Sequence, residues 1–239
     1  KRGDTVAVKP NMSWNVEPEK GATTNPRLVR RIVARCLEAG AKKVYVFDNT
    51  IDSYQLCVAT TRIEAAVKEA GGVIVPGSSK GYYQEVKIPG GTVLQSVQVH
   101  EMVLEADGFI NVPILKHHGS TTITAAMKNL MGAVWDRRAY HWNGLDQCIA
   151  DFTLLRKPDL NVIDAYTVMM SGGPRGTSYK ADLAVKKMQI LSADIVAADA
   201  AAARTWGVAP DRIRHIVYAE KAGIGSMNLD ELSIARIRA

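Results

Sequence analysis

Two adjacent histidines and two lysines form the segment of this sequence best suited to binding or proton transfer. The segment ILKHHGSTTITAAMKNL (114–130) begins as an apolar, strand-like run that leads into Lys116, His117 and His118. Lys128 follows ten residues after His118. Imidazole titrates near neutral pH and commonly ligates metals, and a lysine ammonium neutralises an anion. The segment therefore predicts a site for an anion, a metal ion, or both.

Polar side chains also follow other apolar runs. TVAV leads to Lys9 and Asn11, KVYVF to Asp48, and LNVI to Asp164. Polar residues after strands are common because loops are polar, so any one of them is explained equally well by a turn. Lysine is a poor turn former, however, and both Lys9 and Lys116 follow apolar runs closely. In open α/β sheets ligands bind outside the carboxyl ends of the strands, so we expect these side chains to share one crevice.

The segment after the histidines extends this prediction. In TTITAAMKNLMG, Thr121 or Thr122 is positioned to cap a short helix that carries Lys128 and Asn129. If that helix starts at the crevice, its free N–H groups add a site for an anion. The following AVWDRRAYHWNG contributes further cations and a third nearby imidazole, at Arg137, Arg138 and His141.

Two chemical interpretations of this crevice compete. In the first, an anionic small molecule is bound by Lys9, Asn11, Lys116, Asn129 and Arg137. In the second, a divalent metal is ligated from the set His117, His118, His141, Asp48 and Asp164. The two combine if the ligand is an anionic cofactor that carries a metal. For catalysis we select His118 and His141 as acid, base or metal ligand, together with Lys128.

Adjacent residues of an extended segment point to opposite sides. Only one of His117 and His118 should therefore face the site. The spacing to Lys128 favours His118, although the strand period alone does not choose between them.

Composition excludes several classes of protein. The net charge of +6 and the pI near 9.2 favour anionic partners, but the basic residues are scattered and aromatic residues make up only 6%, which argues against nucleic acid. No apolar run is long enough for a membrane helix. We expect a cytoplasmic protein, or an exported one if a segment before Lys1 carries a signal.

The three cysteines do not form a recognisable cofactor site. Cys36, Cys57 and Cys148 are widely spaced and contain no C-x-x-C pair. A [4Fe–4S] cluster needs four thiolates, so we expect none from this chain alone.

Hydrophobic periodicity predicts alternating strands and helices. Strands are expected at 5–8, 43–47, 73–75, 109–115, 160–165 and 185–191, and helices at 26–40, 61–72, 101–108, 145–156, 194–207 and 211–223. Residues 86–99 read as a hairpin around Pro-Gly-Gly, and 171–178 as a flexible loop. The pattern predicts one α/β domain over residues 1–239: a Rossmann-like, open, mainly parallel sheet with helices on both faces and a small β insertion at 76–100.

Several of these segments together resemble the DUF362 family, a domain of unknown function. They are VAVKPNM, TTNPRLVRRIVARCLEAGAKKVYVFD, INVPILKHHGSTTITAAMKNLMG, DRRAYH and VIDAYTVMMSGGPRG, in the family's order. The resemblance implies the α/β fold and an association with iron–sulfur proteins, although this chain has no ferredoxin cysteine run. A weaker resemblance is to the N-terminal domain of the nickel-pincer lactate racemases. It rests on the order of His118, Lys128 and His141, and it implies a nickel-pincer cofactor joined to the lysine.

Three hypotheses follow from these residues. The first is an enzyme that binds a small anion, with or without a divalent metal. The second is a redox or accessory protein with a redox partner and a cluster supplied elsewhere. The third is a ligand-binding module without catalytic activity. Metal and sulfide analysis of anaerobically purified protein separates them, because only the second predicts iron and sulfide.

Overall fold

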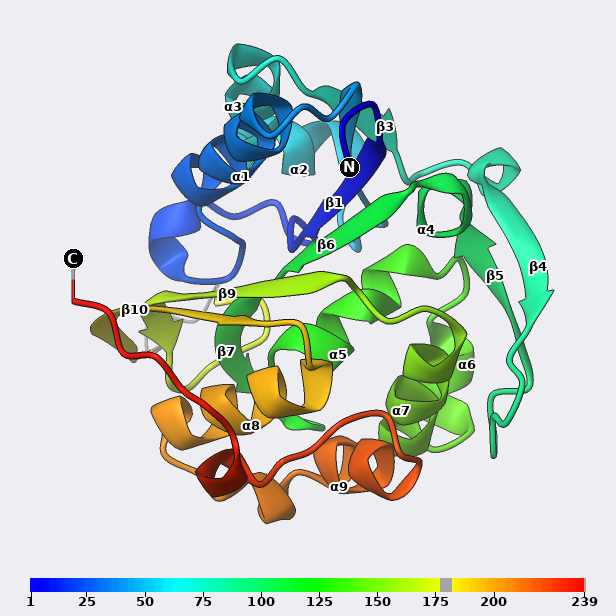
Figure 1. Ribbon diagram of the computed structural model, residues 1–239, viewed down its shortest axis with the longest axis vertical. Coiled ribbons are helices and arrows are strands. Elements are labelled where there is room, and N and C mark those ends of the chain that lie inside the picture. The colour runs from blue at the N-terminus through cyan, green and yellow to red at the C-terminus, as the bar shows by residue number, and fades with distance from the viewer. Residues whose placement is uncertain (177–181, 239) are drawn as a thin grey trace.

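A computed structural model describes residues 1–176 and 182–238, and it shows a mainly parallel sheet between two layers of helices (Figure 1). The strands run in the order β3-β2-β1-β6-β9-β7-β8, and β10 pairs with β9. Their bounds are β1 Thr5–Pro10, β2 Lys43–Asp48, β3 Val73–Pro76, β6 Gly108–Val112, β7 Ile114–His118, β8 Thr122–Thr124, β9 Leu160–Met169 and β10 Leu183–Ser192. Only β8 and β10 pair antiparallel to their neighbours in this sheet. The predicted fold class is confirmed.

The two faces of the sheet pack against different helices because successive strand residues point to opposite sides. On β1, Val8 belongs to the apolar cluster under α1 (Pro26–Glu38), α2 (Tyr54–Thr60) and α3 (Ile63–Glu69). Its neighbour Ala7 belongs to the cluster under α7 (Leu145–Leu155), α8 (Ile195–Trp206) and α9 (Arg214–Lys221). Figure 1 shows these two groups of helices on opposite sides of the strands.

Helix α1 begins as its sequence predicts. The Asn25 side chain accepts a hydrogen bond from the Arg27 N–H at 2.9 Å, and Pro26 takes the first helical position, where no N–H is needed. Val29 and Val33 are buried against the sheet. This cap places the start of α1 beside the carboxyl end of β1.

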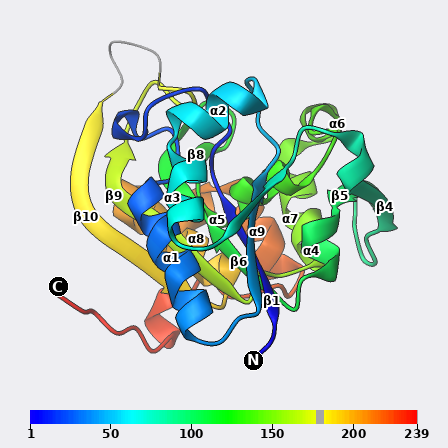
Figure 2. The same ribbon diagram turned by 90° about the horizontal axis from the view of Figure 1, so that it is seen from above.

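The predicted insertion is a separate two-stranded antiparallel sheet. It consists of β4 (Tyr83–Lys87) and β5 (Ser96–His100), and α4 (Glu101–Glu105) follows directly. Both views place this hairpin on the side of the molecule away from β10 (Figures 1 and 2).

The region around the histidines differs from the prediction. The expected single strand 109–115 is divided at Pro113 into β6 and β7, because proline has no N–H to donate to a sheet ladder. Lys116, His117 and His118 therefore lie within β7 rather than after it.

The helix expected from Thr121 or Thr122 starts later. Residues 122–124 form β8, which pairs with β7, and the helix α5 is only Ala126–Asn129. The 3-10 helix η3 (Leu130–Ala133) follows, and then α6 (Arg138–Trp142). A β-hairpin between β7 and β8 thus holds the two histidines in extended conformation.

Two further differences concern β9 and the loop after it. β9 continues to Met169, so Asp164 lies inside the strand and not at its end. The predicted loop 171–178 is described only to residue 176, and its remaining residues lie outside the described part of the chain. No helix among the described residues is long and apolar enough to cross a membrane.

Candidate functional site

The carboxyl ends of β1 and β2 hold a buried ion pair. Lys9 Nζ lies 2.8 Å from Asp48 Oδ1, and both residues are fully buried. Lys9 also donates to the Pro10 carbonyl at 3.1 Å. The other Asp48 oxygen accepts from the Met12 N–H at 2.9 Å. Burial lowers the pKa of Lys9, and the Asp48 carboxylate opposes that shift.

This pair can form only because residue 132 is a glycine. A Cβ at Gly132 would stand 2.0 Å from Asp48 Oδ1 and 2.6 Å from Lys9 Nζ. The backbone of η3 thus passes directly over the ion pair and separates it from the space above.

A chain of buried asparagines fixes α5 to the sheet. Asn11 Nδ2 donates to Asn129 Oδ1 at 3.0 Å, and Asn129 Nδ2 donates to Asn111 Oδ1 at 2.9 Å. Asn111 Nδ2 then donates to Asn161 Oδ1 at 3.0 Å and to the Ala126 carbonyl at 2.9 Å. Since each amide is buried and both donates and accepts, the network rigidly sets the position of Lys128, which lies between Ala126 and Asn129.

Asp199 of α8 completes the support of α5. Its carboxylate is fully buried and accepts from the N–H groups of Ala126 and Met127. These are the helix N–H groups that the sequence suggested for an anionic ligand, and a side chain of the protein occupies them. His215 stands behind, with Nε2 3.8 Å from Asp199 Oδ2 and Nδ1 3.1 Å from Asp146 Oδ1.

Above the ion pair and the asparagines lies a cavity of about 360 Å³. Its cationic lining residues are Lys116, Lys128, Arg137 and Arg138, and its imidazoles are His118 and His141. The remaining lining residues are Asn11, Ser13, Trp14, Ile51, Thr124, Asn129, Met131, Gly132 and Pro174. No aspartate or glutamate is among the described residues that line it. The described side chains that line the cavity therefore give it a positive electrostatic potential.

The cationic side chains of the cavity differ in how they are held. Lys116 is 1% exposed, and its Nζ donates to the Ala22 carbonyl and to Asn11 Oδ1. Arg137 donates to the carbonyls of Asn49 and Thr50, both at 2.8 Å, which leaves other guanidinium N–H groups free. Arg138 is exposed at the mouth.

Lys128 is different. Within the described part of the chain its Nζ makes no hydrogen bond and has no carboxylate within ion-pair distance. Burial, together with the nearby Arg137, lowers the pKa of Lys128 to about 8. For Lys116, burial and then Lys128 lower the pKa to about 7.

The two histidines of the cavity are poor cations for the same reason. Burial, and then the charges of Lys128 and Lys116, lower the pKa of His118 to about 3. Burial and Lys128 also lower the pKa of His141, which is exposed at the rim. His118 Nδ1 accepts from the Ser120 N–H at 3.1 Å, so the neutral ring carries its proton on Nε2. Both rings are therefore uncharged imidazoles at neutral pH.

His117 faces away from this cavity. Its Nδ1 accepts from the Gly173 N–H at 3.2 Å, and its ring stacks near Trp206 with centroids 6.3 Å apart. Because side chains alternate along β7, His118 faces the cavity and His117 faces the region near α8.

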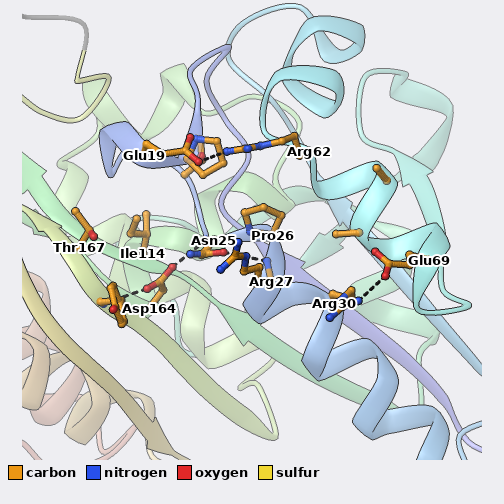
Figure 3. Close-up of a pocket in the computed structure, with 15 residues that line it drawn as sticks. Glu19, Asn25, Pro26, Arg27, Arg30, Arg62, Glu69, Ile114, Asp164 and Thr167 are labelled. Carbon is orange, nitrogen blue, oxygen red and sulfur yellow. Dashed lines mark hydrogen bonds and ion pairs between the residues drawn. The ribbon is translucent and has the colours of Figure 1, made fainter.

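Asp164 lines a second, larger cavity of about 650 Å³. Figure 3 shows it beside the start of α1, where its carboxylate accepts from the Asn25 N–H at 2.9 Å and the Tyr166 N–H at 3.1 Å. Ion pairs between Arg30 and Glu69 and between Arg62 and Glu19 border that cavity (Figure 3).

The five candidate metal ligands do not come together. Asp48 is bound to Lys9, while His117 and Asp164 lie outside the cavity that His118 and His141 line. Among residues 1–176 and 182–238, no group of three or more histidine, cysteine, aspartate or glutamate side chains is placed to hold a metal ion. The cysteines are distributed over α1, α2 and α7, and all three are free thiols.

Several residues of the site were not found from the sequence. Asn111, Asn161 and Asp199 each lie in or beside an apolar run, where nothing local marks them as side chains that hold α5 to the sheet. The one clue in the sequence is that a polar side chain within an apolar run is expected to be buried and therefore needs a hydrogen-bond partner. Trp14, Ser13 and Thr124 also line the cavity, and no sequence motif identified them as site residues.

Comparison with known proteins agrees with the family resemblance. The model of a family described as Domain of unknown function (DUF362) matches residues 6–204. The thylakoid-associated protein sll1697 of Synechocystis sp. is 24% identical over 208 residues, which are 83% of this chain and 63% of that protein. This chain thus spans less than two thirds of that relative.

Two solved structures share the fold. One is the lactate racemase apoprotein of Thermoanaerobacterium thermosaccharolyticum, with 10% identity and a TM-score of 0.50 over 92% of this chain and 49% of that one. The other is a structural-genomics protein of Thermotoga maritima, with 12% identity and a TM-score of 0.50 over 92% of this chain and 55% of that one. At these identities the likeness concerns the fold alone.

Proposed function

For this chain, which belongs to the family described as Domain of unknown function (DUF362), we propose a site for an anionic small molecule in the cavity between β7, α5 and α6. The observation that carries this proposal is the lining itself. Four cationic side chains meet there, and no acid is among the described lining residues. Arg138 has Asp136 as a counter-charge at 3.4 Å, but Lys116, Lys128 and Arg137 have no carboxylate within ion-pair distance among the described residues. Like charges held close together are unfavourable, and an anionic ligand would offset that cost.

The four cations would act differently on such a ligand. Arg137 is pinned by two backbone carbonyls, so its free N–H groups point in a fixed direction suited to a carboxylate or phosphate. Lys128 supplies an ammonium that has no partner among the described residues. Lys116 Nζ already donates to the Ala22 carbonyl and to Asn11 Oδ1, so it contributes positive charge to the cavity rather than a free hydrogen-bond donor. Arg138 at the mouth would attract the anion as it enters.

The imidazoles make the site suitable for catalysis as well as binding. His141 lines this cavity as a neutral imidazole and can accept a proton from a bound molecule, whereas His118, whose Nδ1 accepts from the Ser120 N–H, offers an Nε2–H donor. This favours an enzyme over a module that only binds. We propose no metal step, because only His118 and His141 of the five candidate ligands face the cavity.

Binding of simple anions tests the proposal. Thermal unfolding and isothermal titration calorimetry would be measured with sulfate, phosphate, acetate and malonate at pH 7. An anion at about one hundred times its Kd should stabilise the wild type by about 2.7 kcal/mol. Lys128→Met should lose this stabilisation.

A matched control is Arg31→Met, because Arg31 is an exposed cation of α1 outside the cavity. This variant should respond to anions as the wild type does. If no anion stabilises the wild type, or if Arg31→Met loses the response as fully as Lys128→Met, the cavity is not an anion site.

A further inference from the structure

The three lysines at the carboxyl ends of the strands are not equivalent. Lys9 Nζ is engaged by Asp48 and the Pro10 carbonyl, and Lys116 Nζ by the Ala22 carbonyl and Asn11. Both are at most 1% exposed. Lys128 is half-buried, lines the cavity, and has no hydrogen-bond acceptor or carboxylate partner among the residues that the structure describes. Its amine is thus the one of the three that an incoming molecule can reach.

We propose that the Lys128 amine forms an imine with a small oxo acid, meaning a carboxylate or phosphate that also carries an aldehyde or ketone group. This inference rests on the proposed anion site and specifies its ligand. The cationic neighbours bind the anionic group, and the carbonyl carbon is thereby held beside Lys128 Nζ. The ligand must be small, because the cavity is about 360 Å³.

The chemistry balances without any further reactant. The neutral amine nitrogen of Lys128 adds to the carbonyl carbon, and the carbonyl oxygen leaves as water with the two amine hydrogens. A carbon–nitrogen double bond replaces the carbon–oxygen double bond, and nothing is oxidised or reduced. His141 lines the same cavity and can carry the proton from nitrogen to the departing oxygen, and the Nε2–H of His118 is a donor for that oxygen.

The electrostatics agree with this role. Amines become nucleophilic when burial or a neighbouring cation favours their neutral form. Burial and Arg137 act on Lys128 in that direction, and they lower its pKa to about 8. The asparagine network and Asp199 hold α5, so the backbone that carries Lys128 belongs to a hydrogen-bonded helix instead of a loop.

Reductive trapping tests the proposal. The protein would be incubated with sodium cyanoborohydride and one of three aldehydes: glyoxylate, glycolaldehyde phosphate, or uncharged glycolaldehyde. Hydride from the reagent reduces an imine to a stable secondary amine, which peptide mapping by mass spectrometry then locates. Glyoxylate and glycolaldehyde phosphate distinguish a carboxylate ligand from a phosphate ligand, and glycolaldehyde lacks the anionic group.

The expected result is a single label at Lys128 from at least one anionic aldehyde, with loss of that label when sulfate is added. Lys128→Arg keeps the charge but cannot form the imine, so it should lose the label. Lys42→Arg, at an exposed lysine outside the cavity, should be labelled as the wild type is. Mapping on the wild type decides the question even if Lys128→Arg folds poorly.

Two results would overturn the imine. One is a label spread over the exposed lysines, and the other is equal labelling of Lys128 by uncharged glycolaldehyde. If anions stabilise the wild type in thermal unfolding but no label forms, the imine is excluded and the anion site stands. If neither effect is seen, both proposals fail.

Discussion

Lys9 Nζ lies 2.8 Å from Asp48 Oδ1 at the carboxyl ends of two adjacent parallel strands, and neither side chain reaches solvent. A buried ion pair is weak support for stability, because both ions lose their hydration. Breaking it is expensive, since the remaining ion is left without a counter-charge. The pair lies beneath the cavity, and removing either residue would leave the other as a buried charge without a partner.

Removing both partners of this ion pair should cost less stability than the two single removals added together. We expect Asp48→Asn, or Lys9→Met, to lower the free energy of unfolding by about 3–5 kcal/mol. The double variant Lys9→Met/Asp48→Asn should lose less than the sum of the two. Urea unfolding of the four proteins measures the coupling. Additive losses would show that the pair is not coupled.

Gly132 should tolerate no side chain. A Cβ there would meet Asp48 Oδ1 at 2.0 Å, so Gly132→Ala must displace the ion pair or the η3 backbone. We expect a loss of roughly 3 kcal/mol, as for overpacking in a core. Gly119→Ala is the matched control, because a Cβ at Gly119 meets nothing within 4 Å, and it should change stability by less than about 0.5 kcal/mol. Equal melting temperatures for the two variants would contradict this account.

The sequence predicted those parts of the fold that depend on local periodicity. The N-cap Asn25, the apolar strands and the hairpin near Pro-Gly-Gly are all properties of short segments, and they are confirmed. Pro113 was inside a predicted strand, yet its missing N–H divides that strand in two. The start of α5 was also wrong, because Asp199, about seventy residues away, supplies the cap that Thr121 and Thr122 were expected to provide.

His118 and His117 should differ in their effect on anion binding. His118 lines the cavity, whereas His117 accepts from the Gly173 N–H on the other side of β7. We expect His118→Ala to weaken sulfate binding in calorimetry, because its Nε2–H donor is lost, and we expect His117→Ala to leave it nearly unchanged. Equal losses of affinity in the two variants would show that strand alternation does not separate their roles.

The site was less accessible to sequence reasoning than the fold. Residues near strand ends, such as Lys9 and Asp48, are suggested by the geometry of parallel sheets. The same rule predicted that Asp164 lies at the end of its strand. Strand β9 instead continues to Met169, and the Asp164 carboxylate accepts a hydrogen bond from the Asn25 N–H. Which side of a strand a residue faces depends on where the strand begins and ends, and that depends on its neighbours in the sheet.

Anion affinity should fall as the pH rises. Below pH 7 both Lys116 and Lys128 hold their protons, and above pH 8 both lose them, because their pKa values are about 7 and about 8. His118 is already neutral in this range, and the lowered pKa of His141 favours its neutral form. Losing a charged hydrogen bond costs about 1.5–3 kcal/mol, so sulfate affinity should decrease roughly tenfold or more between about pH 6.5 and 9. Sulfate is the suitable probe, since its own charge is constant here.

Stability without an anion should change in the opposite direction. The pKa values of Lys116 and Lys128 in the folded protein lie below the ordinary lysine value of 10.5, so the unfolded chain binds more protons between about pH 7 and 10.5. Their contribution to stability therefore rises with pH across that range. Urea unfolding of wild type and Lys116→Met as a function of pH measures this contribution. A slope that is unchanged in Lys116→Met would contradict the lowered pKa of Lys116.

Lys128→Met should separate binding from folding. The carboxylates that could have been stranded by this change have other partners. Asp136 accepts from the Arg138 N–H at 3.0 Å, Asp164 lies in the other cavity, and Asp146 is 3.1 Å from His215 Nδ1. The variant removes a half-buried charge that lacks an acceptor among the described residues, so we expect the free energy of unfolding to stay constant or to rise by up to roughly 1 kcal/mol. Sulfate should no longer raise the melting temperature. A variant that melts several degrees below the wild type would mean that Lys128 serves the structure instead of a ligand.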